Sequence, residues 1–578
     1  MEHKTLAFAF RLMLMMVGGM AVQPVFAGET RLLAARPCQH SLVIEADRDV
    51  YVAGETVFFR LHSVQQQSLA EQTELVNVVL HQGNTVNSIQ QVMVLDGPSG
   101  FGSFLLEDTL QTGWYELLAF TNAMRGSHSQ CMGRTTLYVV NRFDRIVADI
   151  LQDQHDAGGQ EEVVQYTQSS APALKIQTDR EVYGLRQQGK ISLVLNDPVY
   201  EHSFLSVSVV PAASFFSDLP EQVSFPDFSG HPDIFPSERL GMVLTGRIVS
   251  SREDLTLQGR KVLLSTPDTM VNLMYSLSDA SGIFHFQLNP GYYGRQVYLQ
   301  VYEPRYEEGV FRVVPNNRFQ LQEWPTPQPR DFTSGARDYV LQTQQAVRIA
   351  RAYELPDRIR TTPQHHKGFL KPVYSNADYI VVPSDYIKLD DFQEIARELL
   401  FGLRLRRQGG SIHMRMLDAR SAPSFFSQPP LVFVNGVLVR DLETLLPLNT
   451  DAIRRVELLN RRWALGDLDF EGALALFLEP STGFPLHRGN VTVAIPAIAS
   501  QAMADNQPEQ DRPAHRVPDF RPLLLWEPHI RLKSGQRKEL TFVTSDMDGD
   551  FRIRVSAIMP DGSIRYFFCD FSVQPLNP

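Results

Sequence analysis

One short stretch has the residue types and spacing of a phosphate-binding loop. It reads "GLRQQGK" from Gly184 to Lys190 and matches such a loop up to its lysine. A phosphate-binding loop continues with a Ser or Thr that binds magnesium, and it leads into a helix whose N-terminal N–H groups hold the phosphate. Here Ile191 follows the lysine, and "ISLVL" alternates like a strand. We therefore expect no phosphate site at this loop.

Two other stretches contain metal-ligating residue types. The acidic run "DMDGD" begins at Asp546 and lacks the downstream glutamate that completes a calcium loop. It lies between two strand-like segments, so we predict an Asp-Gly hairpin turn there. His365 and His366 are adjacent, and no third ligand can be recognised near them. The sequence therefore predicts no metal-binding residue and no cofactor.

Signatures of catalysis are missing from the sequence. It contains no Gly-x-Ser-x-Gly elbow, no His-Glu-x-x-His motif, no Gly-x-Gly-x-x-Gly loop and no Cys-x-x-Cys pair. We expect no catalytic residue and a protein that is not an enzyme. An exported enzyme whose site is assembled from distant residues is an alternative, because sites rather than folds decide function.

The N-terminus has the features of an export signal over residues 1–27. Lys4 and Arg11 accompany the apolar run "LMLMMVGGMAV", and the small residues that a signal peptidase reads end at Ala27. The apolar run is shorter than the ~20 residues of a membrane-spanning helix. We expect cleavage after Ala27 and an exported chain without a transmembrane helix, in the periplasm or at the outer membrane.

The composition favours a globular protein built from short strands. Of the 578 residues, 43% are hydrophobic and 21% are charged, which allows several apolar cores. The 36 glycines and 36 prolines favour many turns between strands. The formal net charge of -11 argues against a nucleic-acid partner, which requires a basic surface.

The chain has three cysteines, Cys38, Cys131 and Cys569. Cys38 precedes the first strand-like segment of the first β-rich unit, and Cys131 precedes its last one. Outer strands that lie side by side would allow a disulfide between them in an oxidising compartment. Free, partly buried thiols fit equally well, because sequence alone does not fix connectivity.

The chain contains an internal repeat. "DRDVY" begins at Asp47 and "DREVY" begins at Asp179, and each is followed by a glycine, Gly54 or Gly189, and by an alternating strand. We expect the tyrosine to cap a strand end and the glycine to turn the chain into the next strand. Alternation and turn signals predict a β-sandwich, a polar linker and a second β-sandwich, over residues 40–141, 142–173 and 174–240.

Both copies resemble the start of macroglobulin-type domains, the immunoglobulin-like sandwiches of alpha-2-macroglobulins. "GWYELLAFTNAMRG" is similar to a later strand of such domains in exported proteins of Bacteroidota. Residues 241–315, with "TGRIV", "GRKVLLS" and "SDASGIFHF", resemble the carboxypeptidase regulatory-like sandwich. That resemblance implies a turn at Asp279 and Gly282, and it implies that Phe284 and Phe286 point into the core.

Residues 316–372 are interpreted as a connector. The segment begins with the proline-rich, extended stretch "EWPTPQPRDF". It then has the pattern of an amphipathic helix, with Val340, Val347 and Ala350 near one face.

Residues 373–480 mix helical and strand patterns. "DFQEIARELLFGLRLRRQGG" predicts a helix that ends at Gly409-Gly410, and "LVFVNGVLV" predicts a hairpin with an Asn-Gly turn. A leucine-rich helix is expected at 442–446. A further helix is expected to carry the densest basic cluster of the chain, which consists of Arg454, Arg455, Arg461 and Arg462. This cluster is either a solvated face or a surface for an acidic partner or lipid head groups.

The order of these elements is similar to the plug domain of TonB-dependent outer-membrane transporters, with "VFVNG", "IRRVELL" and "GALALFLEP" as the counterparts of its motifs. The hairpin and the last strand are apolar on both faces, as expected of strands covered by helices or by a partner. A transporter continues with a barrel of many strands. Residues 481–578 are too few for a barrel and are interpreted as a C-terminal β-sandwich.

The predicted fold class is mainly β, with tandem immunoglobulin-like β-sandwiches and one small α/β plug-like domain. The resemblances imply a non-enzymatic scaffold or binding protein whose partner is an outer-membrane transporter or a surface lipoprotein. A macroglobulin-like, non-covalent protease inhibitor is an alternative, since covalent capture requires a Cys-x-Glu-Gln thioester that the sequence lacks. The sequence leaves the identity of the partner and the oligomeric state open.

Overall fold

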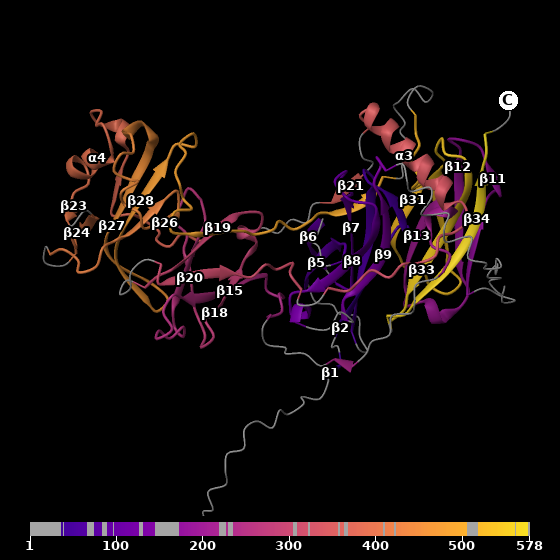
Figure 1. Cartoon of the computed structure of the whole chain (residues 1–578), viewed down its shortest axis with the longest axis horizontal. Coiled ribbons are helices and arrows are strands. Elements are labelled where there is room, and N and C mark those ends of the chain that lie inside the picture. The colour runs from indigo at the N-terminus through magenta and orange to yellow at the C-terminus, as the bar shows by residue number, and fades with distance from the viewer. Residues whose placement is uncertain are drawn as a thin grey trace, which may run out of the picture.

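The structure, a computed structural model, is mainly β and contains tandem β-sandwiches and one α/β unit, which confirms the predicted fold class. Two lobes lie along its long axis (Figure 1). One lobe contains two sandwiches and helix α3 (Ala336–Ala352), and the other contains a third sandwich and the α/β unit. The predicted signal peptide lies outside the described residues. The structure describes residues 36–37, 40–65, 74–83, 89–95, 97–126, 131–144, 173–218, 227–228, 235–303, 309–321, 324–355, 359–362, 368–408, 411–420, 424–505, 518–560 and 562–575.

The first sandwich is formed by one continuous segment of the chain. Its strands are β2 His40–Ala46, β3 Val50–Val52, β4 Thr56–Gln65, β5 Glu74–His81, β6 Ile89–Leu95, β7 Ser99–Leu105, β8 Gly113–Thr121 and β9 Gly133–Val140. One sheet has the order β2-β4-β7, and the other has the order β3-β9-β8-β5-β6. Apolar residues from both sheets meet in the core, as the alternation of the strands predicts.

The second sandwich is assembled from two segments that lie far apart in the sequence. Its strands are β10 Leu174–Thr178, β11 Val182–Tyr183, β12 Gln188–Leu195, β13 Phe204–Pro211, β31 Leu525–Ile530, β32 Arg537–Val543, β33 Gly549–Ile558 and β34 Ile564–Val573. The sheets have the orders β10-β12-β32 and β11-β34-β33-β13-β31. The prediction of separate sandwiches at 174–240 and 481–578 is therefore wrong. The first segment alone leaves edge N–H and C=O groups unpaired, and the C-terminal strands pair with them.

The two sandwiches share one topology. In each, the second strand pairs in parallel with the last strand, β3 with β9 and β11 with β34. They differ between the fourth and fifth strands, where the second sandwich carries the long insertion 212–524. Val209 on β13 pairs with Leu525 on β31, so the insertion leaves and re-enters the sandwich at neighbouring strands.

The third sandwich belongs to this insertion. Its strands are β15 Met242–Ser250, β16 Lys261–Ser265, β17 Met274–Leu277, β18 Ile283–Leu288, β19 Gln296–Val301, β20 Phe311–Pro315 and β29 Val491–Ala494. As predicted, the N–H of Gly282 donates to the C=O of Asp279 at 3.0 Å to form a turn, and Phe284 and Phe286 are buried. The predicted boundary at residue 315 omits β29, which returns from beyond the α/β unit to pair with the edge of β19.

The α/β unit consists of one sheet, one helix and a two-stranded hairpin. Its elements are β22 Tyr379–Val381, α4 Phe392–Glu398, β23 Leu403–Gln408, β24 Ser411–Met416, β25 Leu431–Val434, β26 Val437–Val439, β27 Ile453–Leu465 and β28 Leu468–Leu478. The sheet has the order β22-β27-β28-β25-β26, and β23 pairs with β24. The predicted hairpin turn is confirmed, because Asn435 and Gly436 connect β25 to β26 at φ 47° and 83°, which is typical of a type I′ turn.

The helices predicted in this unit are wrong in extent or in type. Helix α4 begins after Asp391, whose side chain caps it, and it ends well before Gly409-Gly410 because Gly402, at φ 86°, turns the chain into β23. The segment expected to be an arginine-bearing helix is strand β27, which pairs with β28 over most of its length. Residues 442–446 form no helix and include a turn.

The sheet of the α/β unit is apolar on both faces, as predicted. On one face Val432 and Leu474 share a core with α4 and the β23–β24 hairpin. On the other face Phe433 and Ala475 share a core with Leu263 of the third sandwich. The chain itself therefore covers the second face.

Helix α3 covers part of the first sandwich. Val340 and Val347 share a buried cluster with Val50 and Tyr138, which confirms these two residues of the predicted apolar face, whereas Ala350 is only half-buried. Two short strand pairs complete the described structure, β1 Arg36–Pro37 with β14 Asp227–Phe228 and β21 Ile359–Thr362 with β30 Gln501–Ala504. Within the described ranges, no helix is both long and apolar enough to cross a membrane.

Candidate functional site: charged groups inside and between the sandwiches

The two loops with ligand-binding residue types contact each other. Arg186 of the glycine-rich loop donates from Nε and Nη2 to the carboxylate oxygens of Asp546 at 2.6 and 2.5 Å. Although burial opposes the change, these hydrogen bonds lower the pKa of Asp546. As predicted, the glycine-rich loop leads into strand β12. The predicted Asp-Gly hairpin is wrong, because β32 and β33 on either side of it belong to different sheets. One ion pair thus joins both loops and both segments of the second sandwich.

The described residues contain no group of three or more His, Cys, Asp or Glu that could hold a metal ion. His365 and His366 lie outside these residues. Cys131 is disulfide-bonded, and Cys569 has a free thiol whose pKa is raised by burial. Because Cys38 lies outside the described residues, its bridge to Cys131 stays a prediction.

The repeated motif makes the same hydrogen bonds in both sandwiches. Tyr51 Oη donates to Asp47 Oδ1 at 2.9 Å, and Tyr183 Oη donates to Asp179 Oδ1 at 2.6 Å. Each aspartate also accepts a backbone N–H from the next strand, at 2.8 Å in the first copy and 2.6 Å in the second. The aspartate and the tyrosine therefore tie the short crossing strand to its neighbours, which accounts for the expected position of the tyrosine at a strand end.

The expected role of the glycine holds in the first copy only. Gly54 adopts φ 100° and turns the chain into β4. Arg186 stands at the same offset in the second copy and adopts φ 53°. Gly189 instead lies within β12, where an added Cβ would stand 2.4 Å from the Phe542 ring and 2.8 Å from the Tyr183 ring. Close packing, and not a turn, therefore requires Gly189.

The charged side chains of the first copy are buried. Arg48, which is 2% exposed, contacts Asp47 at 2.7 Å and Glu55 at 2.8 Å. Its guanidinium carbon lies 4.3 Å from the centroid of the Tyr51 ring. Burial raises the pKa of both Asp47 and Glu55 in spite of the adjacent arginine. Each charge in this group therefore depends on the others, because a buried charge without a partner is strongly unfavourable.

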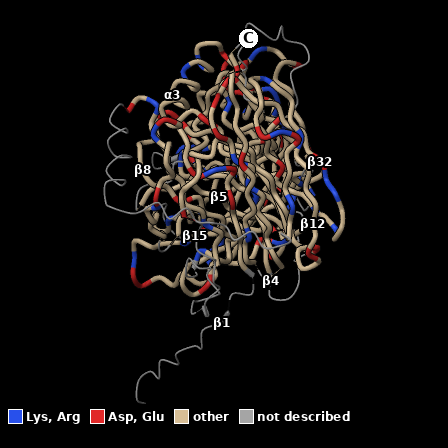
Figure 2. Tube along the Cα trace, turned by 90° about the vertical axis from the view of Figure 1, so that its right-hand side faces the viewer, with Lys and Arg blue, Asp and Glu red and all other residues tan. Residues whose placement is uncertain are grey.

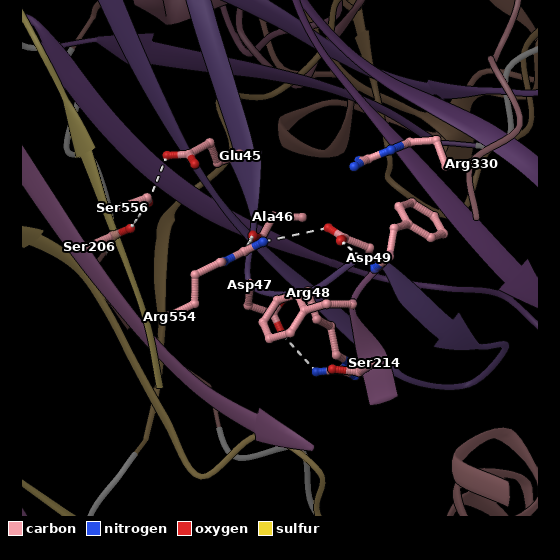
Figure 3. Close-up of polar contacts among 12 residues, drawn as sticks. Glu45, Ala46, Asp47, Arg48, Asp49, Ser206, Ser214, Arg330, Arg554 and Ser556 are labelled. Atoms are coloured by element: carbon pink, nitrogen blue, oxygen red, sulfur yellow. Dashed lines mark hydrogen bonds and ion pairs between the residues drawn. The ribbon is translucent and has the colours of Figure 1, made fainter. Parts of the chain in front are cut away.

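A second buried network joins the first sandwich to the second. Arg60 on β4 donates to Glu45 at 2.7 Å, to the C=O of Phe204 on β13 at 3.0 Å and to Ser556 Oγ on β33 at 2.9 Å. Ser556 also donates to Glu45, as Figure 3 shows. Although burial disfavours its charged form, the charges of Arg60 and Arg554 lower the pKa of Glu45. The ionised carboxylate therefore stabilises the contact between the sandwiches.

Arg554 extends this network along β33 (Figure 3). It donates to the C=O of Ala46 and forms an ion pair with Asp49 at 3.6 Å. Asp49 also binds the inserted segment, since its N–H donates to Ser214 and its carboxylate accepts from the N–H of Phe216, both at 3.1 Å. These directional bonds fix the orientation of the two sandwiches and are suited to a structural role.

One histidine at the same interface lacks hydrogen-bond partners. His62 is 1% exposed, and neither of its ring nitrogens has a partner among the described residues. Its ring centroid lies 4.3 Å from that of Phe204, beside a small cavity that His529 also lines. Burial, together with the positive charges of Arg60, His529 and Arg531, lowers the pKa of His62 to about 3. The neutral imidazole is therefore the form that this interface accommodates.

This interface has no recognisable sequence motif. Glu45 and Arg60 are directly opposite each other on β2 and β4. In the sequence, the feature that could have indicated this ion pair is one acidic and one basic residue within otherwise apolar strand segments. Their partners on β13 and β33 could not be found in this way, because no local pattern connects these strands.

The basic cluster of the sequence is largely compensated within the α/β unit. It lies on strand β27, where Arg454 and Arg462 are exposed and Arg455 and Arg461 are half-buried. Three of its four arginines form ion pairs, namely Arg455 with Glu457 at 2.8 Å, Arg462 with Glu471 at 2.7 Å and Arg461 with Asp378. Of the two interpretations of this cluster, the ion pairs favour a solvated protein surface.

Comparison with known proteins gives distant structural likenesses. No protein-family model and no curated protein matches the chain. A crystal structure of Salmonella alpha-2-macroglobulin reacted with methylamine is 10% identical in sequence and has a TM-score of 0.23. The alignment covers 95% of this chain and 40% of the macroglobulin chain. Trypsin-activated alpha-2-macroglobulin from Escherichia coli is 10% identical in sequence and has a TM-score of 0.23. The alignment covers 94% of this chain and 42% of that macroglobulin chain.

A CARDB domain from Pyrococcus furiosus matches a smaller part of the chain. It is 15% identical in sequence and has a TM-score of 0.14, and the alignment covers 18% of this chain and 97% of the CARDB chain. By comparison, the match to the Salmonella macroglobulin spans about two fifths of the length of that protein. TM-scores this low do not define a shared overall arrangement, so the β-sandwich content rests on the sheets themselves.

Proposed function

We propose that this chain is a non-enzymatic, exported binding or scaffold protein of the periplasm or outer membrane, which serves as an accessory to an outer-membrane transporter or surface-lipoprotein complex. The observation that carries the proposal is the buried polar interface between the first two sandwiches, formed by Glu45, Arg60 and Arg554. Its directional bonds make the two sandwiches a rigid base.

The path of the insertion supports a role in docking. Residues 212–524 leave and re-enter the second sandwich at adjacent strands, so the base can form while it carries a large additional lobe. The α/β unit lies at the far end of the long axis from the second sandwich (Figure 1). Recognition is often carried by segments that a rigid scaffold presents in this way.

The nature of the partner is inferred from the sequence. The α/β unit resembles a plug domain in the order of its motifs, and the N-terminus resembles an export signal. The described strands that follow the unit complete the third and second sandwiches, and we infer that the unit contacts a membrane complex rather than conducting a solute itself.

Affinity capture tests this proposal. The tagged full-length protein, isolated from a detergent-solubilised cell envelope, should bring a specific outer-membrane transporter or surface lipoprotein with it. A variant with a glycine–serine linker in place of residues 375–488 should lose that partner. A matched variant with such a linker in place of residues 145–172 should keep it.

Chemical cross-linking provides a readout that does not depend on the deletion. In the unmodified complex, cross-links to the partner should map to the α/β unit. The absence of any envelope partner, or capture that persists after removal of residues 375–488, would contradict the proposal. Circular dichroism verifies that both linker variants retain their β structure.

A further inference from the structure

One face of the β23–β24 hairpin presents only basic side chains at two successive cross-strand pairs. Arg404 lies opposite Arg415 and Arg406 lies opposite His413, and all four are exposed. Like charges directly opposite each other destabilise a strand pair. Stability of the hairpin therefore does not explain this face.

The other face of the hairpin explains how it folds. Leu403, Met414 and Met416 are buried in the core that includes α4. Because side chains alternate along a strand, the apolar residues point inward and the basic ones outward. The inward face stabilises the hairpin in spite of the repulsion on the outward face.

The outward face has no acidic partner in the described part of the chain. Arg404, Arg406 and Arg415 form no ion pair with a described carboxylate, whereas the adjacent Arg407 pairs with Glu443 at 3.0 Å. The opposite end of the molecule differs, because acidic and basic residues are interspersed there in the view of Figure 2. The hairpin therefore has a local positive charge on a chain whose formal net charge is -11.

One aromatic ring lies next to these arginines, and a second, exposed one precedes them in the chain. The guanidinium carbons of Arg404 and Arg415 lie 4.5 and 5.3 Å from the centroid of the Phe425 ring. Phe401, in the turn before β23, is 73% exposed. Figure 1 shows the hairpin at the outer end of the α/β lobe, where an extended surface can approach it.

We propose that this face binds the phosphate groups of an anionic lipid bilayer. The forked N–H donors of arginine bind phosphate oxygens in pairs. Basic side chains beside exposed aromatic rings are typical of segments that lie on membranes. A bilayer also provides an apolar layer for Phe401, which an acidic protein surface does not. This contact goes beyond the proposed function, because it requires no protein partner.

The size of the effect follows from the number of charges. Each basic residue near an anionic bilayer raises the binding constant about fivefold, the equivalent of ~1 kcal/mol. Replacement of Arg404, Arg406 and Arg415 by glutamine should therefore weaken binding roughly a hundredfold. Salt should weaken the binding of the unmodified protein, because these charges are exposed to solvent.

Vesicle co-sedimentation with the purified full-length protein tests the proposal. The protein should bind vesicles of phosphatidylcholine and phosphatidylglycerol, and it should not bind vesicles of phosphatidylcholine alone. R404Q/R406Q/R415Q should lose this binding. The matched control R252Q/R360Q/R537Q removes three exposed arginines that already have a carboxylate partner, and it should bind like the unmodified protein. Phe401→Ser should weaken binding by a smaller factor.

Three outcomes would overturn the proposal. The first is no binding of the unmodified protein to anionic vesicles, and the second is an equal loss in both triple variants. The third is binding to immobilised polyglutamate but not to vesicles, which would make an acidic protein the ligand. The unfolding midpoint of R404Q/R406Q/R415Q should change little, since the loss of repulsion between the arginines offsets the loss of the contacts of Arg404 and Arg415 with the Phe425 ring. Because the assay contains no envelope protein, its failure would leave the affinity-capture test of the proposed function untouched.

Discussion

Arg48 of the first sandwich and Arg180 of the second occupy the same position in the repeated motif, yet their side chains are 2% and 55% exposed. Helix α3 accounts for part of this difference, because Tyr339 Oη donates to the C=O of Val50 at 3.2 Å and the helix covers the first copy. In the second copy Val182 is 49% exposed. The same local motif therefore forms with or without a cover, and the covering element decides which of its charges are buried.

The largest difference between the copies is expected from replacement of the arginine. Arg48→Met leaves Asp47 and Glu55 buried without a cation and should lower the free energy of unfolding by ~3–5 kcal/mol. Arg180→Met removes an exposed contact, in which Nε lies 4.0 Å from Asp179, and should change that free energy by less than ~0.5 kcal/mol. Urea denaturation followed by circular dichroism measures both.

A double variant serves as the control for this comparison. Asp47→Asn combined with Arg48→Met removes one of the two uncompensated charges, so it should be more stable than Arg48→Met alone. Similar losses in Arg48→Met and Arg180→Met would show that burial does not distinguish the two copies.

The next largest effect is expected from the pH. His62 corresponds to Val194 in the second sandwich, since each pairs with the equivalent residue of the preceding strand. The folded-state pKa of His62 is about 3, below the ~6.5 expected for an unfolded chain. The stability contributed by the neutral ring is therefore complete above pH ~6.5 and is lost as the pH falls toward ~3, with a loss of ~2 kcal/mol by pH ~5.

The variant His62→Val makes this position of the first sandwich like the second. The difference in unfolding free energy between pH ~7.5 and pH ~5 should be smaller in His62→Val than in the unmodified protein, by about 2 kcal/mol. Val194→His is the matched variant, and it should add less acid sensitivity because that position is only half-buried. The same pH dependence in the unmodified protein and in His62→Val would rule out this role of the interface.

The smallest difference is expected from the tyrosines, because both copies make the same bond. Tyr51→Phe and Tyr183→Phe each remove one O–H donor to an aspartate and should each lower the unfolding free energy by about 1 kcal/mol. The loss should be somewhat larger for Tyr51, whose acceptor Asp47 is fully buried. Thermal unfolding of the two variants measures this, and no loss in either would show that the shared hydrogen bond does not stabilise the motif.

Sequence patterns were sufficient where the interacting residues are close together in the chain. The turn at Asn435-Gly436 follows from the ease with which these two residue types adopt positive φ. Phe284 and Phe286 are buried because alternate residues of a strand share one face. Helix α3 is amphipathic in sequence and packs on the first sandwich through the expected face. These features depend on neighbouring residues, so a short window of sequence determined them.

Only the tertiary structure decided which distant segments meet. The residues of β27 include good helix formers, and they form a strand because β22 and β28 offer hydrogen-bond partners on both sides. The C-terminal strands complete the second sandwich because β12 and β13 have edges that they can pair. Arg186 and Asp546 each resemble part of a ligand site in isolation and form an ion pair once that sandwich is assembled. Strand pairing and ion pairing depend on proximity in space, which periodicity along the chain does not record.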